Sequence, residues 1–227
     1  MNNQKKIYFN SPVLFNYKKN INKIIQLKNY ASNGYFSKKC VKWLIKNLKV
    51  KDALLVHSCT AALEMCALLL NIKKGDEIIM PSYTFVSTAG AFVLRGGKPV
   101  FVDIDSTTCN IDPAKIEQSI SKKTKAIVVV HYAGISCDMD PILKIAKKYK
   151  LYVIEDAAHG IMSTYKGRPL GSIGDLATLS FHETKNVHCG EGGALLINNP
   201  KFIKRAKIIR DKGTNRDLFN QNMVKKY

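Results

Sequence analysis

The chain has 227 residues, of which 46% are hydrophobic, and carries a formal net charge of +19. This size allows one large domain or two small ones, with enough apolar residues for a substantial core. Apolar runs such as 126–130 are too short to span a bilayer, and no signal-type segment follows residues 1–6. We therefore expect a soluble cytoplasmic protein.

The positive charge raises the hypothesis of nucleic-acid binding. The basic residues are mostly lysines and are scattered singly or in pairs along the chain. Nucleic-acid recognition relies more on arginine and on basic blocks. The composition thus indicates a solvated surface, and we expect no nucleic-acid partner and no membrane association.

Six cysteines are dispersed without a CxxC pair, which argues against a zinc site and against a disulfide framework. Cys189 lies beside the glycine-rich bend 190–193, where a reactive thiol is one interpretation. We expect it instead to be a small packing residue. We also expect no metal site, because no cluster of histidines and acids has the spacing of metal ligands.

Taken in chain order, helical spacing in the region 40–48 predicts an amphipathic helix with Trp43 in the core. A short strand at 53–56 and a helix at 61–70 follow. Apolar strands then alternate with helices, and residues 214–227 show no terminal element. The expected strands are 77–80, 100–104, 126–131, 151–155, 176–181 and 194–197, and the expected helices are 87–94, 113–120, 141–150 and 201–210.

This alternation is typical of an α/β domain with a mostly parallel sheet and helices on both faces. No linker or repeat interrupts it, so a single domain is expected. Ligands of such sheets bind outside the carboxyl ends of the strands. Chemically capable side chains stand at these predicted ends: Ser58-Cys59-Thr60, Tyr83-Thr84-Phe85, Asp156 and Lys185.

Each of these features alone leaves alternatives open. Lys185, in a loop between two strands, is either a desolvated nucleophilic amine or a surface lysine. The 58–60 segment predicts an anion site or a plain helix N-cap. Asp156 could be an N-cap, a metal ligand or the partner of a protonated ring nitrogen, and Phe85 could pack in the core or stack on a planar ring. Together they match what pyridoxal phosphate requires: a lysine, an acid and a helix-end phosphate site.

An ordered set of motifs makes the interpretation specific. The segments SCTAALE, MPSYTFVSTA, VHYAG, EDAAHG, SFHETKN and GEGGALL resemble the sugar-nucleotide aminotransferases of the DegT/DnrJ/StrS type. The resemblance implies the large domain of a fold-type I pyridoxal-phosphate-dependent transferase, with a seven-stranded sheet, in a homodimer. Family members continue well beyond the position of Tyr227. We therefore expect 1–227 to be the cofactor-binding large domain, incomplete at its C-terminus and lacking the small C-terminal domain.

The resemblance also implies roles around the cofactor ring. Lys185 would form the Schiff base with the cofactor, and Asp156 would hold the pyridine nitrogen protonated. Phe85 would stack on the ring. His159 would lie near the ring hydroxyl, where this subfamily often has glutamine, and can fill the same hydrogen-bonding role.

Other residues would hold the cofactor phosphate, again by resemblance. They are Thr60, the backbone amides near Cys59 and Ala61, and Ser180. A lysine at position 185 favours transamination, because relatives that dehydrate sugars carry histidine there.

The implied reaction takes an amino group from L-glutamate, releasing 2-oxoglutarate, and transfers it to C4 of dTDP-4-keto-6-deoxyglucose. The product, dTDP-4-amino-4,6-dideoxygalactose, serves enterobacterial common antigen synthesis, which belongs with lipopolysaccharide and cell-surface polysaccharide biosynthesis. Two alternatives stay open: an aminotransferase for another nucleotide keto-sugar, and an inactive truncated remnant. We expect the isolated chain to be weakly active or inactive.

Overall fold

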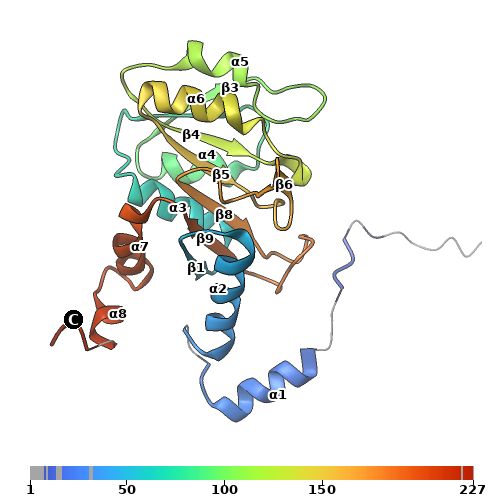
Figure 1. Ribbon diagram of the computed structural model, residues 1–227, viewed down its shortest axis with the longest axis vertical. Coiled ribbons are helices and arrows are strands. Elements are labelled where there is room, and N and C mark those ends of the chain that lie inside the picture. Colours follow the sequence, from blue (N-terminus) through green and yellow to red (C-terminus); the bar gives the residue numbers. More distant parts are fainter. Residues whose placement is uncertain (1–7, 9, 14–16, 31–32, 221, 227) are drawn as a thin grey trace, which may run out of the picture.

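The computed structural model describes residues 8, 10–13, 17–30, 33–220 and 222–226. At its centre lies a seven-stranded sheet with the strand order β1–β9–β8–β5–β4–β2–β3 (Figure 1). Neighbouring strands from β8 to β3 run parallel, and β9 is antiparallel to both β8 and β1. The expected mostly parallel α/β fold is confirmed. The strands are β1 (Asp52–Val56), β2 (Glu77–Pro81), β3 (Lys98–Val102), β4 (Thr124–Val130), β5 (Tyr152–Asp156), β8 (Leu176–Ser180) and β9 (Gly193–Ile197).

Helices cover both faces of this sheet, and a separate two-stranded hairpin lies between β5 and β8 in the chain. The hairpin consists of β6 (Thr164–Tyr165) and β7 (Arg168–Pro169). The α-helices are α1 (Tyr17–Leu27), α2 (Tyr35–Leu48), α3 (Cys59–Leu69), α4 (Val86–Val93), α5 (Pro113–Ile116), α6 (Met139–Tyr149), α7 (Ile203–Arg210) and α8 (Arg216–Asn220). The short 3-10 turns are η1 (Glu117–Ser119), η2 (Tyr132–Gly134) and η3 (Pro200–Phe202).

Strand alternation divides the core into layers, because successive side chains of a strand point to opposite faces. In β4, Ala126 and Val128 pack with α3, α4 and α7, whereas Ile127 and Val129 pack with α5 and α6. A third cluster joins α2 to β1, β8 and β9. The central strands are apolar on both faces, which explains why their sequences are nearly continuous hydrophobic runs.

Some expectations about element bounds are wrong. The strand expected at 100–104 lies at Lys98–Val102, and Ile104 instead forms an isolated bridge with Ile111. The helix expected at 113–120 ends after one turn and continues as the 3-10 turn η1. Residues 214–227, expected to lack an element, contain α8. This helix has only five residues and is held by hydrogen bonds from the Leu218 and Phe219 N–H groups to the Asn215 carbonyl. A segment this short shows no amphipathic pattern that the sequence could reveal.

Two side chains expected in the interior are exposed. Leu44 and Leu48 bury the inner face of α2, but Trp43 is 43% exposed beside them. Cys189 is also exposed, and its thiol donates to the carbonyl of Glu191. The expectation of a packing role therefore fails for both residues.

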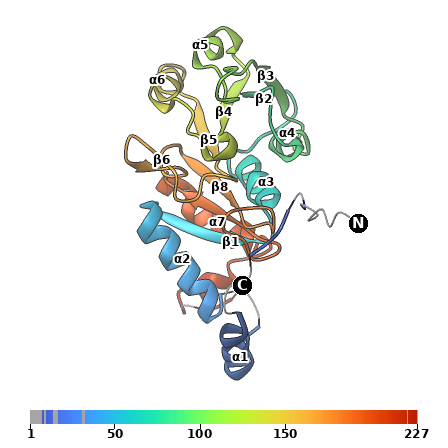
Figure 2. The same ribbon diagram turned by 90° about the vertical axis from the view of Figure 1, so that its right-hand side faces the viewer.

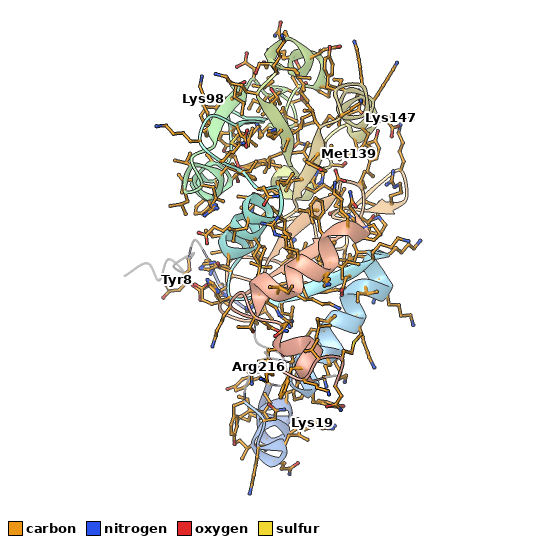
Figure 3. All side chains as sticks on the ribbon, turned by 90° about the vertical axis from the view of Figure 1, so that its left-hand side faces the viewer. Tyr8, Lys19, Lys98, Met139, Lys147 and Arg216 are labelled. Atoms are coloured by element: carbon orange, nitrogen blue, oxygen red, sulfur yellow. The ribbon has the colours of Figure 1, made fainter. Side chains whose placement is uncertain are left out.

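The periphery matches the charge pattern of the sequence. Helix α1 lies at one end of the molecule, away from the sheet (Figure 2), and none of its residues is buried. Figure 3 shows Lys19, Lys98 and Lys147 projecting outward from three separate elements, as expected of a dispersed, solvated charge. Among the described residues, no helix is long and apolar enough to span a bilayer. The start of the chain, expected to lack a signal segment, lies outside the described residues.

A tight contact holds the start of β9 against the turn before α3. A Cβ on Gly193 would lie 2.4 Å from the Ser58 carbonyl carbon and 2.6 Å from the Cys59 nitrogen. Both of these contacts are with backbone atoms, which cannot move aside as a flexible side chain can. The contact therefore fixes where α3 begins.

We predict that Gly193→Ala lowers the free energy of unfolding by about 1–3 kcal/mol, because the added methyl group overpacks this contact. Urea unfolding followed by circular dichroism measures it. The matched control is Gly90→Ala inside α4, where a Cβ meets nothing within 4 Å. That substitution should be neutral or stabilise by up to about 1 kcal/mol. Equal effects of the two substitutions would contradict the prediction.

Candidate active site

A cavity of about 580 Å³ opens at the carboxyl ends of β1, β2, β4, β5 and β8. Loops from five strand ends at one edge of the sheet therefore contribute to one site. Most of the predicted site residues line it, and Ala61 does not. Those that do are Cys59, Thr60, Phe85, Asp156, His159, Ser180 and Lys185.

Lys185 lies in the loop that joins the antiparallel strands β8 and β9. The loop is tied across its base by backbone hydrogen bonds from Phe181 to Gly192 and from Glu183 to Gly190, each 2.8 Å long. Gly190 adopts a φ of +88°, which a glycine permits at the bend. The lysine side chain is half-buried, and its Nζ lies 2.8 Å from Nε2 of His159. The amine is therefore aimed across the cavity, and the surface-lysine interpretation is wrong.

The environment of His159 favours the neutral form of its imidazole. Its burial and the positive charge of Lys185 lower the pKa of the imidazole, and Asp156 partly opposes them. A neutral ring can accept a hydrogen bond from the Lys185 ammonium at Nε2. His159 thus orients the amine.

Asp156 ends β5, and its carboxylate lies at the base of the cavity with only 5% of the residue exposed. Thr88 donates to Oδ2 at 2.7 Å, and the Ala158 N–H donates to Oδ1 at 3.2 Å. Burial raises the pKa of the carboxyl, while these two donors lower it. A carboxylate in this setting favours a cationic or proton-donating partner.

The N-terminus of α3 forms another side of the cavity. Ser58 caps the helix by accepting from the Ala61 N–H at 3.1 Å, so this amide is already engaged. The Thr60 hydroxyl lies 2.7 Å from the Ser87 hydroxyl, and both line the cavity. The start of α3 and these two hydroxyls, one from α3 and one from α4, form a site suited to an anion.

An aromatic rim surrounds the opening. Phe85, the N-cap residue of α4, lines the cavity and is 73% exposed, so it does not pack in the core. The rings of Tyr83 and Tyr132 meet edge to face at 5.0 Å, and their hydroxyls are 3.1 Å apart. The rim can hold a planar group by stacking.

Sequence reasoning missed two lining residues, Ser87 and Tyr132, and one buried residue behind the cavity, Thr88. Thr88 orders Asp156 and itself accepts from Thr84, four residues earlier in the chain, at 2.8 Å. Their spacing of four residues in the segment TFVST was the available signal. Tyr132 and Ser87 carried no local signal, because only the fold brings them to the cavity. Among the described residues, no group of three or more metal-ligating side chains occurs.

Comparison with known proteins gives one family. The model of the DegT/DnrJ/EryC1/StrS aminotransferase family matches residues 16–226. The uncharacterized protein MJ1066 of Methanocaldococcus jannaschii is 48% identical across 75% of this chain and 44% of its own. The spore coat polysaccharide biosynthesis protein SpsC of Bacillus subtilis is 44% identical across 75% of this chain and 44% of its own. GDP-perosamine synthase of Caulobacter vibrioides is 42% identical across 72% of this chain and 44% of its own. The chain therefore spans under half the length of these curated relatives.

Solved structures agree. The putative sugar aminotransferase Spr1654 of Streptococcus pneumoniae, in its PMP form, has a TM-score of 0.82 and 30% identity across 89% of this chain and 56% of that one. DesI, solved in the presence of its TDP-sugar product, has a TM-score of 0.81 and 31% identity across 87% and 50% of the two chains. Spr1654 has also been solved in its PLP form.

The raised pKa of Asp156 makes the stability of the cofactor-free protein depend on pH. Because the folded-state pKa lies above the ordinary value of 3.8, the contribution is fully present below pH 4 and is lost as the pH rises through the folded-state pKa. We predict that Asp156→Asn removes this component. In urea unfolding between about pH 4 and pH 8, the wild type should lose more stability with rising pH than the variant. Parallel curves would contradict the assignment.

Proposed function

The chain belongs to the DegT/DnrJ/EryC1/StrS aminotransferase family, and we propose that it binds pyridoxal phosphate and transfers an amino group to a keto group of a nucleotide sugar. The observation that carries the proposal is that a lysine amine, a buried carboxylate and a helix N-terminus line one cavity. The family uses pyridoxal phosphate, and its solved members include PLP and PMP forms.

The residues of the cavity fit this cofactor. The buried Asp156 carboxylate suits a protonated ring nitrogen, and the N-terminus of α3 with Thr60 suits a phosphate. The absence of a side chain at Gly193 keeps β9 close to that helix start. Phe85 lies at the rim, where it can stack on a ring. When bound, pyridoxal phosphate supplies an electron sink for charge that develops on the reacting carbon.

The chain's own residues divide the remaining work. Lys185 would hold the cofactor covalently. Once released, its Nζ would carry a proton between a carbon of the substrate and a carbon of the cofactor. The His159 Nε2 lies 2.8 Å from that amine and can accept a hydrogen bond from it, because the lowered pKa of His159 keeps the imidazole neutral. Asp156 would keep the ring nitrogen protonated, and Thr88 fixes the carboxylate in the required orientation. Ser180, 8% exposed at the end of β8, would complete the phosphate site with Thr60.

We extend the proposal to a specific reaction. L-Glutamate is the amino donor and leaves as 2-oxoglutarate, and C4 of dTDP-4-keto-6-deoxyglucose is the acceptor. The product is dTDP-4-amino-4,6-dideoxygalactose for enterobacterial common antigen. The sequence motifs support this choice, as does the similarity to DesI with its TDP-sugar product. The similarity to GDP-perosamine synthase supports a GDP-sugar as a second candidate.

Three further parts of the proposal concern the whole protein. Residues 1–227 form a cofactor-binding large domain, the protein acts as a homodimer, and it works in the cytoplasm. The alternative of an inactive truncated remnant predicts cofactor binding without turnover. That result differs from a change in nucleotide preference, which would bear on the substrate alone.

The first test is the visible absorbance of the protein with pyridoxal phosphate. We predict a band from the lysine-linked cofactor that is bleached by glutamate. Lys185→Ala should abolish the band, because Lys185 is the one lysine among the described residues that line the cavity, and Lys185→Arg controls for charge. A folded wild-type protein with no band would overturn the proposed cofactor.

The second test compares nucleotide sugars. We predict that kcat/KM for the dTDP-keto-sugar exceeds that for its GDP counterpart by about tenfold or more, since unpaired buried groups penalise the wrong base. Turnover by the 227-residue chain alone should be weak. The reversed preference would select the GDP candidate, and a cofactor band without any turnover would support the remnant.

A further inference from the structure

A buried carboxylate–imidazole pair lies directly behind the cavity. Glu155 and His131 are both fully buried, and the His131 Nε2 lies 3.0 Å from the Glu155 Oε2. The other Glu155 contacts are backbone N–H donors from Gly171, Ile173 and Gly174 at 2.8, 2.7 and 2.6 Å. The carboxylate therefore accepts four hydrogen bonds, which fills the sites that its two oxygens offer.

The second nitrogen of the imidazole fixes its protonation pattern. The Cys137 N–H donates to Nδ1 of His131 at 3.2 Å, so this nitrogen is an acceptor. The ring proton therefore lies on Nε2 and is donated to Glu155. The imidazole is held from both sides in one tautomer and one orientation.

The pair joins the chain segments that shape the cavity. Glu155 immediately precedes Asp156 on β5, and the two side chains point to opposite faces of the sheet. His131 follows β4, lines the cavity, and donates its N–H to the Asp156 carbonyl at 3.1 Å. Tyr132, the next residue, carries the rim ring that meets Tyr83. Movement of the imidazole would therefore displace a carboxylate-bearing strand end and an aromatic wall together.

A plain anchor for the 171–174 loop would not require the histidine. Three backbone amides already bind Glu155, and Asn198 holds the same loop from its other side through the carbonyls of Gly171 and Gly174. The histidine adds a link from this anchored carboxylate to the cavity wall. The hydrogen bond from the His131 Nε2 to the Glu155 Oε2 is thus the contact that joins the anchored carboxylate to the cavity wall.

We propose that His131 and Glu155 are positioning residues that set the placement of Asp156 and Tyr132 for cofactor binding. The inference rests on the proposed function, since it concerns the same cavity. Its distinguishing bond is the Nε2–H donation to Glu155, rather than the contact with Cys137. A side chain that keeps this donor should preserve the site even without the imidazole ring.

The test is a titration of the full chain with pyridoxal phosphate, followed by the visible band, beside urea unfolding without cofactor. His131→Asn retains an acceptor for Cys137 but loses the donor to Glu155, and we expect Kd to rise about tenfold or more. His131→Gln places its amide where Nε2 stood, and Kd should stay within about threefold of wild type. Glu155→Gln should behave like His131→Asn, because its amide N–H₂ faces a donor.

The matched control is Asp175→Asn. Asp175 accepts from the Val153 N–H at 3.0 Å and from Asn199, so it also anchors β5 with a carboxylate, at the strand's opposite end. It should lower stability without changing Kd. If His131→Asn and Asp175→Asn lower stability alike and neither changes Kd, the pair is a plain anchor and the inference fails. If the wild type itself binds no cofactor, the proposed function fails and this inference falls with it.

Discussion

Burial of the Asp156 carboxylate at the carboxyl edge of the sheet is the constraint on which the rest of the site depends. A desolvated carboxylate is unfavourable unless donors or a cation compensate it. The structure supplies Thr88 and the Ala158 amide as donors, and it leaves the cavity side open to a partner. The surrounding elements follow from this arrangement: α4 must present Thr88, and β4 and β5 must end at the same level.

The parallel register explains how such distant residues meet. Val130 pairs with Asp156, so β4 and β5 end at the same level, and Asp156 pairs with Thr178, so β8 continues two residues further to Ser180. The antiparallel strand β9 turns the chain back at the same edge and places Lys185 in the connecting loop. One register therefore sets both the position of the acid and that of the amine. A one-residue slip would turn Asp156 to the opposite face.

The sequence predicted the sheet and several of the side chains that line the cavity, because buried parallel strands are apolar runs and their polar ends stand out. It failed where burial depends on distant packing. Trp43 shares helical spacing with Leu44, yet only the leucine meets β1, β8 and β9. Tyr132 carries no local signal, and only the order of the strands brings it to the cavity. The short helix α8 is below the length at which periodicity is informative.

The same physics separates the two acids of the pair Glu155-Asp156. Both are buried and adjacent, but strand alternation gives them opposite surroundings. Glu155 accepts four hydrogen bonds within the protein and has no capacity left for a ligand. Asp156 accepts from the Thr88 hydroxyl, the Ala158 N–H and, at 4.0 Å, the Cys59 thiol, and it faces the cavity. The first acid is therefore suited to hold the scaffold in place and the second to meet a ligand. His131 connects the two residues, through its imidazole to the Glu155 carboxylate and through its backbone N–H to the Asp156 carbonyl.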